Sequence, residues 1–153
     1  MIDNIDKRII LELQEDGRSS YKSIAKKLGL STPTVFRHVQ RLLKEGVVKI
    51  TAIPDPYKIG HLTVASIGIT ADLKKIDDLV KKLSTFPEIH LMAFTYGRYD
   101  IVCWVQASNA ETLNILVRKI GKLDAVKTME TIMWSQLMKR TYGWLSETEV
   151  EQK

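Results

Sequence analysis

Apolar residues in the first part of the chain recur every three or four positions, the spacing of helices that bury one face. From residue 3 to residue 15 this pattern predicts a helix that ends before Gly17. Its inward positions are Ile5, Ile9, Ile10 and Leu13. Residues 46–53 follow a glycine and are rich in β-branched side chains, which predicts a strand. No partner strand is evident nearby, so pairing with a second subunit is one way to complete it.

The segment between residues 20 and 46 has the end signals of two short helices joined by a tight turn. Ser20 can accept from backbone N–H groups that have no partner within the first helix. Gly29 ends that helix, because glycine adopts the left-handed conformation without steric cost. Ser31 begins the second helix, and Pro33 lies in its first turn, where a missing N–H group costs nothing. This arrangement predicts a helix-turn-helix, which lays its second helix in the DNA major groove.

The pattern changes after residues 53–57, where two prolines and an aspartate forbid regular structure. Beyond this boundary we predict, in order, strand 62–70, helix 72–86, strand 89–96, strand 100–107, helix 108–123 and strand 126–138. The first strand alternates with period two, as a half-buried strand does.

The helix ends in this part of the chain also have recognisable signals. Asp72 can cap the first helix, and Ser108 with Glu111 forms a capping box for the second. The inward positions of the first helix are Leu73, Ile76, Leu79, Val80 and Leu83.

The fold class is therefore α+β: an N-terminal winged helix-turn-helix followed by a ferredoxin-like βαββαβ domain. We assign residues 1–53 to the first domain, 54–61 to a linker, 62–140 to the second domain and 141–153 to a C-terminal tail. Two helices cover only one face of the sheet, so we expect a second copy of the chain to cover the other. A homodimer or a larger assembly follows from this.

Positive charge is concentrated in the helix-turn-helix. Between Arg18 and Lys49 there are eight basic residues and a single acid, Glu45, whereas the whole chain carries +5. A local excess of this kind is the electrostatic footprint of a polyanion partner, although a charged helix face is often only a solvated surface.

The residues expected to contact DNA lie on the second of the two short helices. At 100° per residue, Val35, Val39, Leu42 and Leu43 form its buried stripe. The opposite side and its flanks carry polar groups suited to base edges and phosphates. The predicted DNA-binding residues are Ser31, Thr32, Thr34, Arg37, His38, Arg41 and Lys44.

Composition excludes several other classes of protein. No apolar run is long enough to span a bilayer, and the N-terminus lacks the plan of a signal peptide. The single cysteine, Cys103, fits a core position in a reducing cytoplasm. The three histidines show no metal-ligand spacing, and no catalytic cluster or phosphate-binding glycine loop is present. We therefore expect neither an enzyme nor a cofactor, and no metal site.

Three motifs, in order along the chain, resemble the Lrp/AsnC (feast/famine) transcriptional regulators. Residues 5–18 are similar to the family's first helix and its Asp-Gly-Arg exit, residues 24–48 to its helix-turn-helix, and residues 97–100 to its Gly-x-Tyr-Asp turn. The resemblance covers the chain from Asp3 to about Lys139 and implies a cytoplasmic, sequence-specific regulator of transcription. It further implies a RAM-type regulatory domain, a dimer that in many members assembles into an octamer, and a small effector, usually an amino acid. His38 departs from the family, where a second basic residue is common.

The resemblance also implies an effector site around the turn at residues 95–100. Exposed amides near Gly97 would hold a carboxylate, and Asp100 would meet an α-amino group. A plain hairpin turn explains these two residues equally well. The predicted effector-binding residues are Phe94, Thr95, Tyr96, Gly97, Asp100, Ile132, Met133 and Trp134.

Two alternatives remain open at this point. An architectural DNA-coating protein without effector control would use the same helix and the same oligomer. Tetrapyrrole decarboxylases share the two-domain plan but have no need of the basic recognition face.

Overall fold

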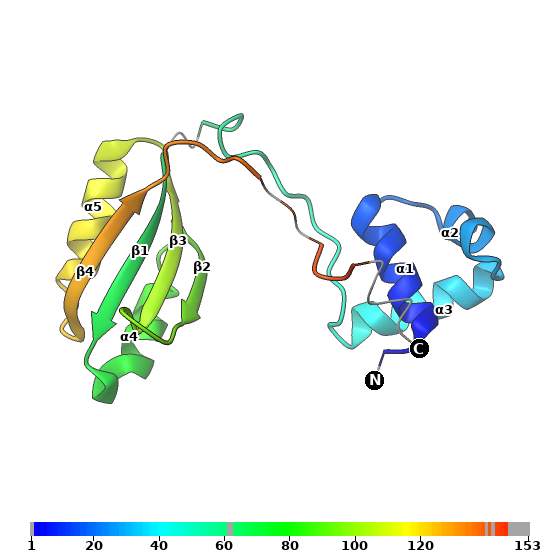
Figure 1. Cartoon of the computed structure of the whole chain (residues 1–153), viewed down its shortest axis with the longest axis horizontal. Coiled ribbons are helices and arrows are strands. Elements are labelled where there is room, and N and C mark those ends of the chain that lie inside the picture. Colours follow the sequence, from blue (N-terminus) through cyan, green and yellow to red (C-terminus); the bar gives the residue numbers. More distant parts are fainter. Residues whose placement is uncertain (1, 61–62, 140, 142, 147–153) are drawn as a thin grey trace. The chain divides into compact units, whose positions relative to one another are not determined.

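The computed structural model describes residues 2–60, 63–139, 141 and 143–146. The chain forms two compact units, one of residues 1–53 with 139–153 and the other of residues 54–138 (Figure 1). The C-terminal tail thus belongs to the N-terminal unit, and the chain passes between the units twice. No helix in the described part of the chain is long and apolar enough to cross a membrane.

The N-terminal unit is a bundle of three helices: α1 (Asn4–Glu15), α2 (Tyr21–Leu28) and α3 (Thr32–Lys44). The predicted caps are confirmed, since Ser20 accepts from the Ser23 N–H group and Ser31 from the Thr34 N–H group. Gly29 ends α2 in the left-handed conformation at φ 67°. The buried core consists of Ile9, Leu13, Ile24, Ala25, Val35 and Val39, with Ile5 and Leu43 packed against it.

The strand predicted at residues 46–53 is not formed in the single chain. The backbone turns at Gly46 (φ 69°), and the residues that follow it up to Ile53 pair with no other strand. Three of its apolar side chains, Val47, Ile50 and Ile53, are nearly half exposed. The sequence has the propensity for a strand, but a strand needs the hydrogen bonds of a neighbour.

The C-terminal unit has the predicted βαββαβ order. Its strands are β1 (Thr63–Ala71), β2 (Ile89–Phe94), β3 (Ile101–Ala107) and β4 (Val126–Met133), and its helices are α4 (Ile76–Leu83) and α5 (Ala110–Gly121). All pairings are antiparallel, in the order β2-β3-β1-β4. The two helices lie on the same face of the sheet (Figure 1).

Several boundaries differ from those predicted. A 3₁₀ turn (Leu73–Lys75), capped by Asp72, precedes α4 and leaves Leu73 65% exposed, so its inward assignment was wrong. Asn109, and not Ser108, caps α5 by accepting from the Thr112 N–H group. The last strand ends at Met133 rather than at residue 138, and Leu62 lies outside the described residues.

The sheet face away from the helices carries its own aromatic cover. The Trp104 and Trp134 rings stack with centroids 5.8 Å apart, and Trp134 Nε1 donates to Ser66 Oγ at 3.0 Å. The Tyr99 ring lies over Gly68, where any Cβ atom would stand 2.6 Å from it. As a result β1 is buried along nearly its whole length, and the predicted period-two burial of this strand was wrong.

Candidate nucleic-acid interface and ligand site

The exposed face of α3 is made by side chains that point away from α1. Phe36, Arg37, Gln40 and Lys44 are all exposed. Phe36 is 51% exposed, and its ring meets that of Tyr21 edge-on at 5.7 Å. Gln40 Nε2 lies 3.5 Å from the Tyr21 hydroxyl. Phe36 and Gln40 were absent from the predicted set, and they lie beside Arg37 on the exposed surface of the helix.

The N-terminus of α3 presents hydroxyl groups on a fixed backbone. Ser31 and Thr32 are exposed, while Thr34 is half-buried. The Ser31 and Thr34 hydroxyls lie 2.8 Å apart in a mutual hydrogen bond. Because this end of a helix offers free N–H groups and partial positive charge, it suits a phosphate oxygen.

His38 and Arg41 reach toward α1, although the Arg41 side chain remains 37% exposed. Asp6, on α1, is fully buried, and its carboxylate accepts from Arg41 at 2.5 and 2.6 Å and lies 2.7 Å from His38 Nδ1. Both residues were predicted to contact DNA; these bonds give each of them a structural role and leave that prediction untested. The Asp6 cluster (Asp6, His38 and Arg41) fixes α3 against α1.

The electrostatics of this cluster favour an ionised carboxylate. Burial alone raises the pKa of Asp6, but hydrogen bonds from the Asp3 backbone, His38 and Arg41 lower it to about 2. Asp3, Asp6 and His38 have ligand atoms within 4.8 Å of one another, close enough for a metal ion. The Arg41 guanidinium already occupies the Asp6 oxygens, however, and its charge opposes a cation there.

The turn at residues 95–100 is tightly built. Gly97 has φ 134°, a positive value that glycine adopts without steric cost. Thr95 Oγ1 donates to the Tyr99 carbonyl at 2.7 Å. One carboxylate oxygen of Asp100 accepts from the Ala71 N–H group at 2.8 Å, so Asp100 holds the turn to β1. Tyr96 is fully exposed.

Glu130 of β4 anchors the same turn, and sequence reasoning did not identify it. It accepts from the Tyr99 hydroxyl and pairs with Arg98 at 3.0 Å. Arg98 in turn lies 5.3 Å from the centre of the Tyr99 ring. The hydrogen bond to Glu130 raises the pKa of Tyr99, with burial adding to the effect. The two contacts of Glu130 join β4 to a turn about 30 residues earlier in the sequence.

The structure divides the predicted effector set between two ends of the sheet. Phe94 pairs with Ile101, and across the sheet Ile101 pairs with Ile69 and Ile69 with Met129. Met133 lies four residues beyond Met129 along β4 and pairs with Ala65, near the other end of β1. β2 and β4 are also the opposite edges of the sheet. Ile132 and Met133 are about half exposed, and Trp134 is engaged by Ser66 and Trp104. One chain therefore does not bring the two parts of the set together.

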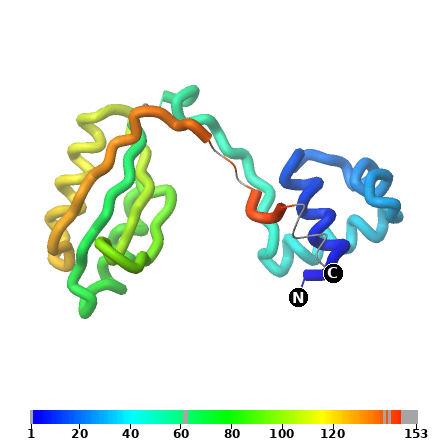
Figure 2. Tube along the Cα trace, in the orientation of Figure 1, coloured from blue at the N-terminus to red at the C-terminus, as the bar shows by residue number. Residues whose placement is uncertain are grey.

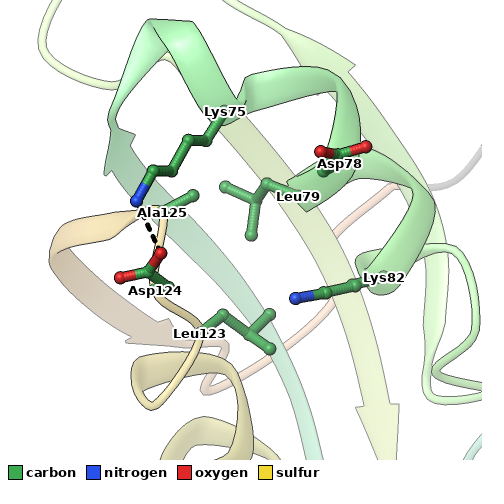
Figure 3. Close-up of a pocket in the computed structure, with 7 residues that line it drawn as sticks. All are labelled: Lys75, Asp78, Leu79, Lys82, Leu123, Asp124 and Ala125. Atoms are coloured by element: carbon green, nitrogen blue, oxygen red, sulfur yellow. Dashed lines mark hydrogen bonds and ion pairs between the residues drawn. The ribbon is translucent and has the colours of Figure 1, made fainter.

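A separate cavity of about 250 Å³ lies between α4 and the turn from α5 to β4 (Figure 3). At its edge Lys75 pairs with Asp124 at 2.5 Å, which raises the pKa of the lysine and lowers that of the aspartate. Leu79 and Leu123 form its apolar part, and Lys82 points toward it. It contains none of the predicted effector residues.

Comparison with known protein families also divides the chain between residues 49 and 64, although the second match extends into the tail as far as residue 144. Residues 2–49 match the description "Winged helix-turn-helix DNA-binding", and residues 64–144 match "Lrp/AsnC ligand binding domain". An uncharacterized HTH-type transcriptional regulator of Pyrococcus horikoshii is 35% identical over 144 residues, covering 93% of this chain and 91% of the relative. HTH-type transcriptional regulator FL11 of Pyrococcus furiosus is 33% identical, covering 92% and 94%.

Solved structures give the same result. AsnC of E. coli superposes with a TM-score of 0.82 at 26% identity, covering 92% of this chain and 96% of that one. A transcriptional regulator of Neisseria meningitidis, solved as an L-Met complex, has a TM-score of 0.85, covers 93% and 95%, and at 18% identity shows the fold alone. The names of the matched families and relatives are those of transcription regulators, not enzymes.

Proposed function

Because the chain belongs to the Lrp/AsnC family of transcriptional regulators, we propose that it recognises a specific promoter sequence through α3 and responds to an amino acid. It is a transcriptional regulator with a DNA-binding helix-turn-helix and an Lrp/AsnC ligand-binding domain. What remains to be assigned is which residues read DNA, how the chain assembles and what ligand it senses. Because a regulator of transcription works on the chromosome, we propose that the protein acts in the cytoplasm.

The exposed row on α3 carries the proposal for DNA recognition. Arg37 reads a guanine edge, Gln40 an adenine edge and Phe36 a thymine methyl group, since these are the pairings that such side chains make in the major groove. Ser31, Thr32 and Thr34 meet phosphate near the helix N-terminus, and Lys44 meets phosphate near the other end. His38 and Arg41 act indirectly, because their bonds to Asp6 hold α3 in place.

A gel-shift titration with a promoter duplex at several salt concentrations tests this assignment. Arg37→Ala is expected to weaken specific binding and reduce discrimination against a mutated duplex. Lys44→Ala is expected to weaken binding to both duplexes alike and lower the salt slope by about one. Unchanged specificity in the Arg37 variant would remove Arg37 from the base-reading set.

We also propose that the working unit is a homodimer, which can assemble further. Two unsatisfied surfaces support this. The apolar segment 46–53 has no ladder partner, and the far side of the sheet exposes Leu91 and Ile132 at its two edges. Light scattering after size-exclusion chromatography is expected to give at least twice the chain mass of 17.5 kDa. A monomer at micromolar concentration would contradict the proposal.

The effector proposal rests on the turn at residues 95–100. The positive φ of Gly97 and the full exposure of Tyr96 support a turn whose backbone N–H groups bind a carboxylate. Because Phe94 and Met133 lie at opposite ends of one sheet, the complete site needs side chains from a second copy. The L-Met complex of the N. meningitidis regulator supports an amino acid as the class of ligand. Calorimetric titration with each of the standard amino acids tests this, and no heat from any of them would reject the class.

A further inference from the structure

The side chain of Gln14 on α1 binds the backbone of the C-terminal tail. Gln14 Oε1 accepts from the N–H groups of Trp144 and Leu145, both at 3.1 Å. Gln14 Nε2 donates to the Leu145 carbonyl at 2.9 Å. The amide thus binds both the N–H and the C=O group of Leu145, as a neighbouring strand does in a ladder. We call these bonds between Gln14 and residues 144 and 145 the tail contact.

The fit at the tail contact is close. A Cβ atom on Gly143 would lie 3.1 Å from Gln14 Nε2, so a side chain at this position would displace the amide or the tail. A cavity of about 350 Å³ continues beside the contact, between α1, residues 48–53 and residues 141 and 143. Ile10 of α1 and Ile50 line it. Figure 2 shows the red end of the trace beside the blue trace of α1.

The root of the same tail is held on the sheet of the C-terminal unit. Directly after β4, the Trp134 N–H group donates to the Val64 carbonyl at 2.9 Å, and the Trp134 indole donates to Ser66. The chain is therefore fixed at Trp134 in the regulatory domain and again at residues 144 and 145 in the DNA-binding unit. The other passage of the chain between the two units falls between Ile53 and Pro54.

We propose that the Gln14 side of α1 is a docking surface for the C-terminal tail of this protein, and that the tail contact restrains the DNA-binding domain. Three observations carry the inference: the paired amide bonds, the close approach that Gly143 allows, and the grouping of the tail with the first 53 residues. The consequence for DNA binding rests on the proposed dimer. In a dimer a restrained second domain has a higher effective concentration at its half-site than a loosely tethered one.

Amide hydrogen exchange on the full chain, without DNA or ligand, tests the docking itself. In the wild type the amides of Trp144 and Leu145 are expected to exchange several-fold more slowly than in Gln14→Ala, because each loses one hydrogen bond in the variant. Gln14→Glu keeps the acceptor and is expected to retain protection. The exposed Gln136→Ala variant is the matched control and is expected to leave exchange unchanged. Equal exchange of these two amides in all four proteins would overturn the proposal.

Fluorescence anisotropy with two duplexes from the protein's own upstream region tests the consequence. One has about 12 base pairs, enough for a single recognition helix, and the other about 24, enough for two half-sites one helical turn apart. Gln14→Ala is expected to weaken binding to the longer duplex by about three- to tenfold and to leave the shorter one unchanged. Equal losses on both duplexes, or none on the longer one, would reject the restraint. If the wild type itself shows no preference for the longer duplex, the proposed dimer fails and the exchange result still decides the docking.

Discussion

Replacing Asp6 by asparagine removes the charge that joins α1 to α3 and keeps the shape of the side chain. In the native unit the carboxylate is fully buried and bound by Arg41 and His38. Removing one partner of a buried pair typically costs about 3–5 kcal/mol when the other charge is left uncompensated. The Arg41 side chain is 37% exposed and can turn to water, so we expect a loss of about 2–3 kcal/mol.

The pKa of Asp6 gives a second, independent magnitude. Its lowering from 3.8 to about 2 corresponds to roughly 2 kcal/mol in favour of the folded state at neutral pH. Because the folded pKa is the lower one, this stabilisation is fully present above about pH 4 and disappears as the pH falls toward 2. The free-energy loss expected from removing the charge and the stabilisation inferred from the pKa of Asp6 therefore agree.

Calorimetric or circular-dichroism melting of the full chain measures the effect. Asp6→Asn is expected to lower the melting temperature of the N-terminal unit by roughly 10–20 °C. Between pH 4 and pH 2 the wild type is expected to lose its advantage over the variant. Glu15→Gln, an exposed acid on the same helix, serves as the control and is expected to change stability by less than about 0.5 kcal/mol. Equal stability of Asp6→Asn and Glu15→Gln at pH 7 would refute the reasoning.

Three further predictions follow from single positions. Arg37→Ala is expected to weaken specific DNA binding by about 1–3 kcal/mol in a gel-shift titration, and full affinity would contradict its assignment. Gly68→Ala is expected to lower the urea midpoint because the new Cβ atom meets the Tyr99 ring at 2.6 Å. Gly121→Ala, whose Cβ atom has ordinary contact at 3.5 Å within a helix, is expected to be neutral or stabilising by up to about 1 kcal/mol. Cys103 is fully buried, and burial raises the pKa of its thiol to about 11. A thiol reagent is therefore expected to label it only after unfolding, and rapid labelling of the native protein would contradict its burial.

Most features of the helix-turn-helix that depend on neighbouring residues were predicted correctly, whereas the cap expected at Ser108 and the inward position of Leu73 were not. The caps at Ser20 and Ser31 and the turn at Gly29 depend on bonds and dihedral angles within a few residues. The βαββαβ order follows from local periodicity, which is also short-range.

Features set by distant partners were missed. A helical wheel places Arg41 on the polar side of α3 but does not show that Asp6, 35 residues earlier, takes its charge. The signal was present: Asp6 lies three residues before Ile9 and seven before Leu13, in the buried stripe of α1, where an acid requires a partner. The strand expected at residues 46–53 has the right composition but no ladder partner within the chain.

Above all, we propose that α3 reads a specific promoter sequence. Fluorescence anisotropy of the protein on its own upstream fragment and on a scrambled duplex, with and without an amino-acid mixture, tests it most directly. We predict tighter binding to the upstream fragment, a shift in affinity with the mixture, and loss of the sequence preference in Arg37→Ala. Equal binding to both duplexes, unchanged by the mixture, would contradict the claim and indicate an architectural DNA-coating protein instead.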